Sequence, residues 1–238
     1  MKRIIFFVFS LMIGIALLSG STQDVEQING NLRGAIIKGD LEYIRTLISA
    51  GADVNHRFKI GRSKDLTPLY LAVGFGHADI CQLLIDAGAL VKVEIKATGK
   101  GSTLMHVAAA SPSGNKAVIN LLVANGLDAN IKSKKLLPPV CLAVLKGTVE
   151  ALEALIENGA DLNVYYPWSG PGATMLTPLH DAVLNDWQER AALLIKGGAN
   201  VNALSGNGES PLDMAMNNGR PEIEKLLREH GAITHKKR

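Results

Sequence analysis

The sequence predicts an all-α solenoid of about six stacked helix-turn-helix repeats, with extended finger loops between them. A Gly followed by a small or apolar residue recurs at a near-fixed period, at Gly51, Gly88, Gly126, Gly159, Gly198 and Gly231. An alanine recurs in phase with these glycines, at Ala35, Ala72, Ala108, Ala143, Ala182 and Ala215. Each glycine also closes a short apolar run. A fixed period of this kind indicates one supersecondary unit copied along the chain.

The first helix of each unit has a recognisable start five residues before its alanine. The fullest copies read Thr-Pro-Leu-Tyr at 67–70 and Thr-Pro-Leu-His at 177–180. A Thr side chain can accept from the free N–H groups of the first turn, and Pro at the first helical position lacks an N–H that would be unpaired there. A second helix follows, as in 77–88, whose apolar residues have helical spacing. Gly88 can adopt the left-handed conformation that ends it.

Taken together, these residues resemble the ankyrin repeat. The motif runs Thr-Pro-Leu-His, Ala, Gly-His, Leu-Leu and Gly-Ala-Asp-Val-Asn, and its last part is clearest at 51–55, 159–163 and 198–202. The resemblance implies paired antiparallel helices stacked into a curved solenoid, with turns projecting beside a concave face. It places the copies at approximately 29–57, 66–93, 102–131, 137–164, 176–203 and 209–234.

Some copies depart from this motif. Copy three reads Leu-Met-His at 104–106 and carries two extra residues between its helices, and copy four opens with Pro138-Pro139. Copy one lacks the Thr-Pro start, and the second helix of copy six is rich in charge. Terminal repeats need a polar outer face, so we expect these two copies to cap the array. Leu121 and Leu155 fall at expected core positions.

The first residues have a different character from the repeats. Lys2 and Arg3 form a basic head, residues 4–18 carry no charge, and small residues follow at 19–21. This pattern is typical of a secretory signal peptide, and the apolar stretch is short for a spanning helix. We therefore expect a signal peptide at 1–20 and the repeat domain at 21–238, located in the periplasm or secreted. Contact with a membrane is expected only if the leader stays uncleaved.

The charge balance of the chain bears on which class of partner it binds. The chain has 25 basic and 22 acidic residues, and two of the basic ones lie in the leader. A near-neutral domain gives no electrostatic reason to expect nucleic acid as a partner.

Cys81 and Cys141 lie a whole repeat apart, farther than the roughly 7 Å that a disulfide spans between Cα atoms. We expect both to be free, buried thiols.

The linkers between copies differ in length. The step from the end of one motif to the next helix start is eight residues in 130–138 and 202–210, but twelve in 55–67, eleven in 92–103 and fourteen in 163–177. Insertions in repeat proteins map to loops on one face, which is often the binding face. Tyr, Trp and Arg are frequent interface anchors. We expect six residues of the lengthened fingers to contact a partner: Phe58, Lys59, Arg62, Tyr165, Tyr166 and Trp168. The alternative is that the aromatic side chains pack locally onto the neighbouring finger.

No pattern in the sequence indicates catalysis. Residues 99–103 resemble a phosphate-binding loop, but Glu94 stands where that motif needs its first Gly, and the repeat phase explains Thr103 as a helix cap. The six His residues do not cluster, and no Gly-x-Ser-x-Gly occurs. We expect no catalytic residue, cofactor, metal site or small-molecule substrate.

These observations favour a non-catalytic interaction module exported to a bacterial envelope. We expect it to bind one folded protein across the concave face and the fingers. The partner is expected to be an envelope or secreted enzyme, which the module would inhibit as an immunity or self-protection protein. Two alternatives stay open: an envelope scaffold or chaperone-like partner, and a secreted effector directed at a host.

Overall fold

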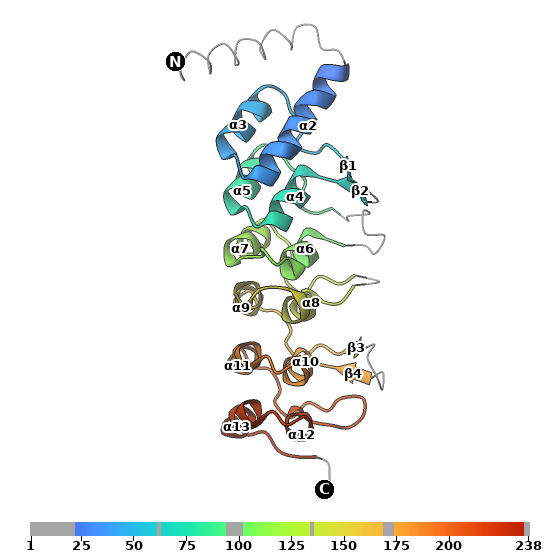
Figure 1. Ribbon diagram of the computed structural model, residues 1–238, viewed down its shortest axis with the longest axis vertical. Coiled ribbons are helices and arrows are strands. Elements are labelled where there is room, and N and C mark those ends of the chain that lie inside the picture. The colour runs from blue at the N-terminus through green and yellow to red at the C-terminus, as the bar shows by residue number, and fades with distance from the viewer. Residues whose placement is uncertain (1–21, 61–62, 94–101, 134–135, 169–173, 236–238) are drawn as a thin grey trace.

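The structure is a computed structural model that describes residues 22–60, 63–93, 102–133, 136–168 and 174–235. Six helical hairpins stack along one axis in the described part of the chain (Figure 1). The pairs are α2 (Thr22–Lys38) with α3 (Leu41–Ser49), α4 (Pro68–Phe75) with α5 (Ala78–Asp86), α6 (Leu104–Ala110) with α7 (Lys116–Ala124), α8 (Pro139–Lys146) with α9 (Val149–Glu157), α10 (Pro178–Leu184) with α11 (Gln188–Lys196), and α12 (Pro211–Asn217) with α13 (Pro221–Glu229).

The predicted repeat fold is confirmed. The first helices of the pairs form one row and the second helices form another, and each helix contacts the corresponding helix of the next pair (Figure 1). All six glycines that define the period have a positive φ, between 78° and 97°. A residue with a Cβ is strained in this conformation, which explains why glycine recurs at the end of each second helix.

The helix starts follow the predicted capping. Thr67 Oγ1 accepts from the Tyr70 N–H at 3.2 Å, and Pro68 occupies the first turn of α4. In α10, His180 Nδ1 accepts from the Thr177 N–H at 3.2 Å and lies 2.8 Å from Thr177 Oγ1. These local bonds satisfy groups that a helix start leaves without an intrahelical partner.

The first helix differs from the prediction. The repeat phase places a helix start near Gly30, but α2 begins at Thr22 and runs through Gly30. Gly30 has no side chain that could cap a helix, and Asn31 follows it instead of Pro, so nothing at this point interrupts the helix. The predicted leader at 1–20 lies outside the described residues. Within those described, no helix combines the length and apolar character needed to cross a membrane.

Two of the lengthened fingers contain short antiparallel hairpins, where the sequence predicts only loops. The first joins β1 (Phe58–Ile60) to β2 (Ser63–Leu66), and the second joins β3 (Tyr166–Trp168) to β4 (Thr174–Leu176). In the second hairpin Tyr166 pairs with Leu176 and Pro167 with Met175. Both hairpins project from the row of first helices (Figure 1).

The core runs the length of the stack between the two rows of helices. Leu155 is fully buried, as predicted, but Leu121 is only partly buried, because Leu122 takes the inward-facing position on α7. Cys81 and Cys141 are free and fully buried, which confirms the predicted thiols. Burial raises the pKa of the Cys81 thiol to about 12.

Asparagine side chains tie consecutive fingers together. Asn55 Oδ1 accepts from the Leu90 N–H at 2.8 Å, while its Nδ2 donates to the Gly88 carbonyl at 3.0 Å. Asn130 and Asn202 make the same pair of bonds to the following finger. Each bond satisfies a backbone group in the next repeat, so the fingers are held in register with the helices.

Candidate functional site

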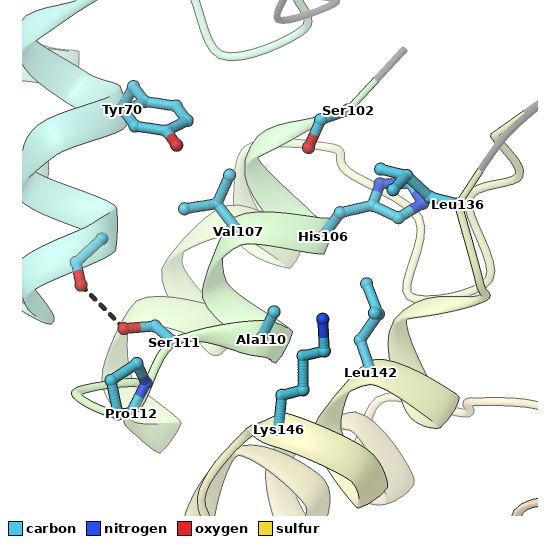
Figure 2. A pocket seen from close by; sticks show the side chains of 11 residues that line it. Tyr70, Ser102, His106, Val107, Ala110, Ser111, Pro112, Leu136, Leu142 and Lys146 are labelled. Atoms are coloured by element: carbon cyan, nitrogen blue, oxygen red, sulfur yellow. Dashed lines mark hydrogen bonds between the residues drawn. The ribbon is translucent and has the colours of Figure 1, made fainter. Parts of the chain in front are cut away.

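A cavity of about 570 Å³ opens on the row of first helices, beside the fingers (Figure 2). Three consecutive repeats form its walls. The side chains that shape it come from α4, α6 and α8: Tyr70, His106, Val107, Ala110, Leu142 and Lys146.

The cavity exists because small residues stand at its centre. On α4, Gly74 follows Tyr70 by one helical turn, and a Cβ added at Gly74 would meet only Val107 Cγ1, at 3.9 Å. On α6, Ala110 lies one turn after Val107. Residues three or four apart share one face of a helix, so these positions leave an open space between the larger side chains around them. A bound side chain could fill that space.

The polar groups of the wall are hydrogen-bond donors. Burial raises the pKa of the Tyr70 hydroxyl, which therefore stays protonated at neutral pH. Burial lowers the pKa of His106, so its ring is neutral there. His106 Nδ1 accepts from the Thr103 N–H at 3.3 Å, which leaves the ring proton on Nε2. Lys146 adds an exposed positive charge, and none of the described lining residues is acidic.

The His106 ring has an unpaired donor. In the corresponding His180, Nε2 donates to the Glu209 carbonyl of the following finger at 3.2 Å. His106 Nε2 has no such partner, although the residue is only 2% exposed. Leu136 of the following finger lines the cavity together with His106. A buried donor without an acceptor is unfavourable, and because this nitrogen is sealed from solvent a ligand could pair with it only if the residues that cover it moved.

The structure buries two of the finger residues expected to contact a partner. Phe58 is 4% exposed and packs against the His56 ring, with centroids 4.8 Å apart, while the Arg33 guanidinium lies 6.0 Å from its centroid. Tyr166 is 3% exposed, with its hydroxyl buried and unpaired. Strand side chains alternate between faces, and these two face inward. The partner-contact prediction is therefore corrected for both, in favour of local packing.

The other finger residues either remain candidates for partner contact or lie outside the described part of the structure. Lys59 is exposed, and Tyr165 is 45% exposed, so both are available to a partner and their role stays a prediction. Arg62 lies outside the described residues. Trp168 belongs to β3, but its side chain is also outside the described part of the structure.

Sequence reasoning missed the residues of the cavity because it looked for function in the fingers. One pattern points to them. The position that follows Tyr70, His106 or Cys141 in the repeat is Leu71, Val107 or Leu142, and two of these three line the cavity. In the described ranges, no three or more His, Cys, Asp or Glu residues come together as metal ligands would. The described lining combines apolar surface with hydrogen-bond donors at its rim.

Comparisons with known proteins agree with this architecture. A family model described as ankyrin repeats in three copies matches residues 32–134 and 140–238. The nuclear factor NF-kappa-B p105 subunit of Gallus gallus is 29% identical over 219 residues, which are 89% of this chain and 21% of that protein. The B-cell lymphoma 3 protein homolog of Mus musculus is 28% identical over 200 residues, 83% of this chain and 43% of that protein.

A solved ankyrin repeat domain from Acinetobacter baumannii has a TM-score of 0.65 and 25% identity, and the alignment covers 85% of this chain and 98% of that one. The chain spans less than half the length of either curated relative. These comparisons do not bear on export, so the periplasmic or secreted location stays a prediction.

Proposed function

Because the chain belongs to the ankyrin-repeat family, whose domains are generally non-catalytic and bind proteins, we propose that it holds a protein partner in the cavity of α4, α6 and α8. The exposed face beside this cavity and the outward-facing finger residues Lys59 and Tyr165 would extend the contact. The observation that carries the proposal is an open, largely apolar cavity formed by three consecutive repeats.

The cavity suits a protein partner for a physical reason. Apolar side chains at its floor can bury apolar surface, which is the main driving force of association. The surrounding helices are held by core packing and by the asparagine bonds between fingers, so little ordering is needed when a partner binds. Neighbouring exposed surface on the same face gives room for an interface of the standard size, about 800 Å² per partner.

We also propose that the partner is an exported enzyme that the module inhibits. The leader-like segment at 1–20 supports export, and a preformed cavity of 570 Å³ supports occlusion of a folded protein. The activity of the captured partner, measured free and bound, tests this role. Inhibition on binding supports it, and unchanged activity contradicts it.

Photocrosslinking in cells of the source organism tests the binding face. The photoreactive residue p-benzoylphenylalanine is placed at Pro112, an exposed residue at the cavity edge, or at Gln188, an exposed residue on α11. We expect a covalent adduct with one protein from position 112 and none with that protein from position 188, because only the first lies beside the cavity. Equal adducts from both positions, or none from position 112, would contradict the proposed function.

A further inference from the structure

We infer that the cavity of α4, α6 and α8 accepts a segment of the partner protein in which a large apolar side chain lies next to a carboxylate. This inference rests on the proposed function and specifies the chemistry of the bound segment. Two features of the described cavity lining carry it: its apolar floor and the positive charge of Lys146 at its rim.

The apolar floor selects the side chain. Val107, Ala110 and Leu142 present hydrocarbon to the cavity, and Gly74 leaves one wall without a side chain. The volume of about 570 Å³ lies within the roughly 300–1,000 Å³ typical of ligand sites. This space accommodates a large aliphatic or aromatic side chain together with the backbone on either side of it. A uniformly polar segment would leave the floor exposed to water.

The positive charge of Lys146 favours a carboxylate next to the bound apolar side chain. Lys146 extends between Ala110 and Leu142 at the rim of the cavity (Figure 2). Within the described ranges it has no ion pair, and none of the described lining residues is acidic. A lysine beside apolar surface attracts an anion more strongly than one surrounded by water, because the local dielectric constant is lower. The carboxylate of an Asp or Glu side chain complements this cation.

A hydroxyl on the cavity wall can contact the same segment. The Tyr70 hydroxyl, on α4, can donate to an oxygen of the bound segment. His106 Nε2 has no acceptor, but it is sealed from solvent and is not one of the contacts. The apolar floor and Lys146 together position an apolar side chain next to a carboxylate.

Selection from a display library of random 12-residue peptides tests the inference on the full chain. The targets are the wild type, Lys146→Glu and the control Lys196→Glu, which reverses an exposed charge on α11. We expect wild-type selection to enrich peptides with Asp or Glu within two positions of Leu, Ile, Phe or Trp. A selected peptide should bind Lys146→Glu at least tenfold more weakly and Lys196→Glu within twofold. Changing its acidic residue to Lys should restore binding to Lys146→Glu.

The inference is overturned if selected peptides carry no acidic residue or bind Lys146→Glu as tightly as the wild type. A library that yields no peptide for the wild type overturns it as well. Its failure is separable from that of the proposed function. If position 112 gives an adduct but Lys146→Glu binds the partner as tightly as the wild type, the inference is wrong and the proposed binding face is supported. If position 112 gives no adduct, both the inference and the proposed function are contradicted.

Discussion

Replacing Leu155 by Ala is expected to lower the free energy of unfolding by about 2–5 kcal/mol. Leu155 lies on α9 in the middle of the stack and is fully buried. Truncation removes apolar contacts and leaves a cavity that the surrounding helices fill only in part. Because a repeat packs only on its neighbours, a defect in a central repeat weakens the interfaces on both sides. Chemical denaturation followed by circular dichroism measures the loss.

Leu121→Ala is the matched control for this prediction. Leu121 has the same chemistry and lies on the neighbouring second helix α7, but it is only partly buried. Less apolar surface is lost there, so its destabilisation should be clearly smaller than that of Leu155→Ala. Equal losses at the two positions, or a loss below about 1 kcal/mol at Leu155, would show that the core is not arranged as described.

The second large effect concerns a buried acid. Asp181 on α10 is fully buried, and neither of its carboxylate oxygens has a hydrogen-bond partner. Burial raises its pKa to about 7. In the unfolded chain the pKa of Asp is about 3.9, so between these two values the folded protein holds a proton that the unfolded chain has released. The free energy of unfolding therefore falls as pH rises from about 4 to 7, and the contribution of Asp181 to this loss is ~4 kcal/mol.

Asp181→Asn is expected to remove this pH dependence. The amide cannot ionise, so the variant should be more stable than the wild type at pH 8, and its stability should change less between pH 4 and 8. Denaturation curves recorded across this range measure both quantities. Glu189→Gln, at an exposed position on α11, is the control and should keep the wild-type slope. If the free energy of unfolding changes with pH equally in Asp181→Asn and the wild type, Asp181 is not the source of the pH dependence.

Asp181 also shows how far sequence reasoning reaches. The sequence-based predictions include none for Asp181, which is fully buried, whereas Asp161 is exposed. The signal was present, because the residue at the same repeat position is apolar in four other copies: Leu71, Val107, Leu142 and Met214. A carboxylate at a repeat position that is apolar in the other copies predicts a buried acid with a raised pKa. Comparing the residues at the same position of each copy identifies it.

Features set by local chemistry were predictable. The positive φ of Gly88 and the bonds between Thr177 and His180 follow from residues that lie within one turn of each other. The buried thiols followed from the repeat phase, which places Cys81 and Cys141 among the core positions. In each case the residues that determine the feature are close in sequence or one repeat period away, so the sequence pattern alone predicts it.

Features set by packing between repeats were not predictable. Phe58 and Tyr166 were expected outside because they lie in lengthened fingers, but the hairpin register turns each of them inward. The cavity depends on small residues in one repeat, Gly74, facing larger ones in the next, Val107. Neither the register nor this juxtaposition can be read from the composition of a single finger or helix.

Binding of a partner in the cavity is tested most directly by its dissociation constant for two glutamate variants. Val107→Glu places a carboxylate on the cavity floor, and Gln188→Glu places the same group on the exposed surface of α11. Thermal denaturation confirms that both variants are folded. We expect the partner captured by photocrosslinking to bind Val107→Glu at least tenfold more weakly than the wild type and Gln188→Glu within twofold. Equal affinity for all three proteins would contradict a binding site on α4, α6 and α8.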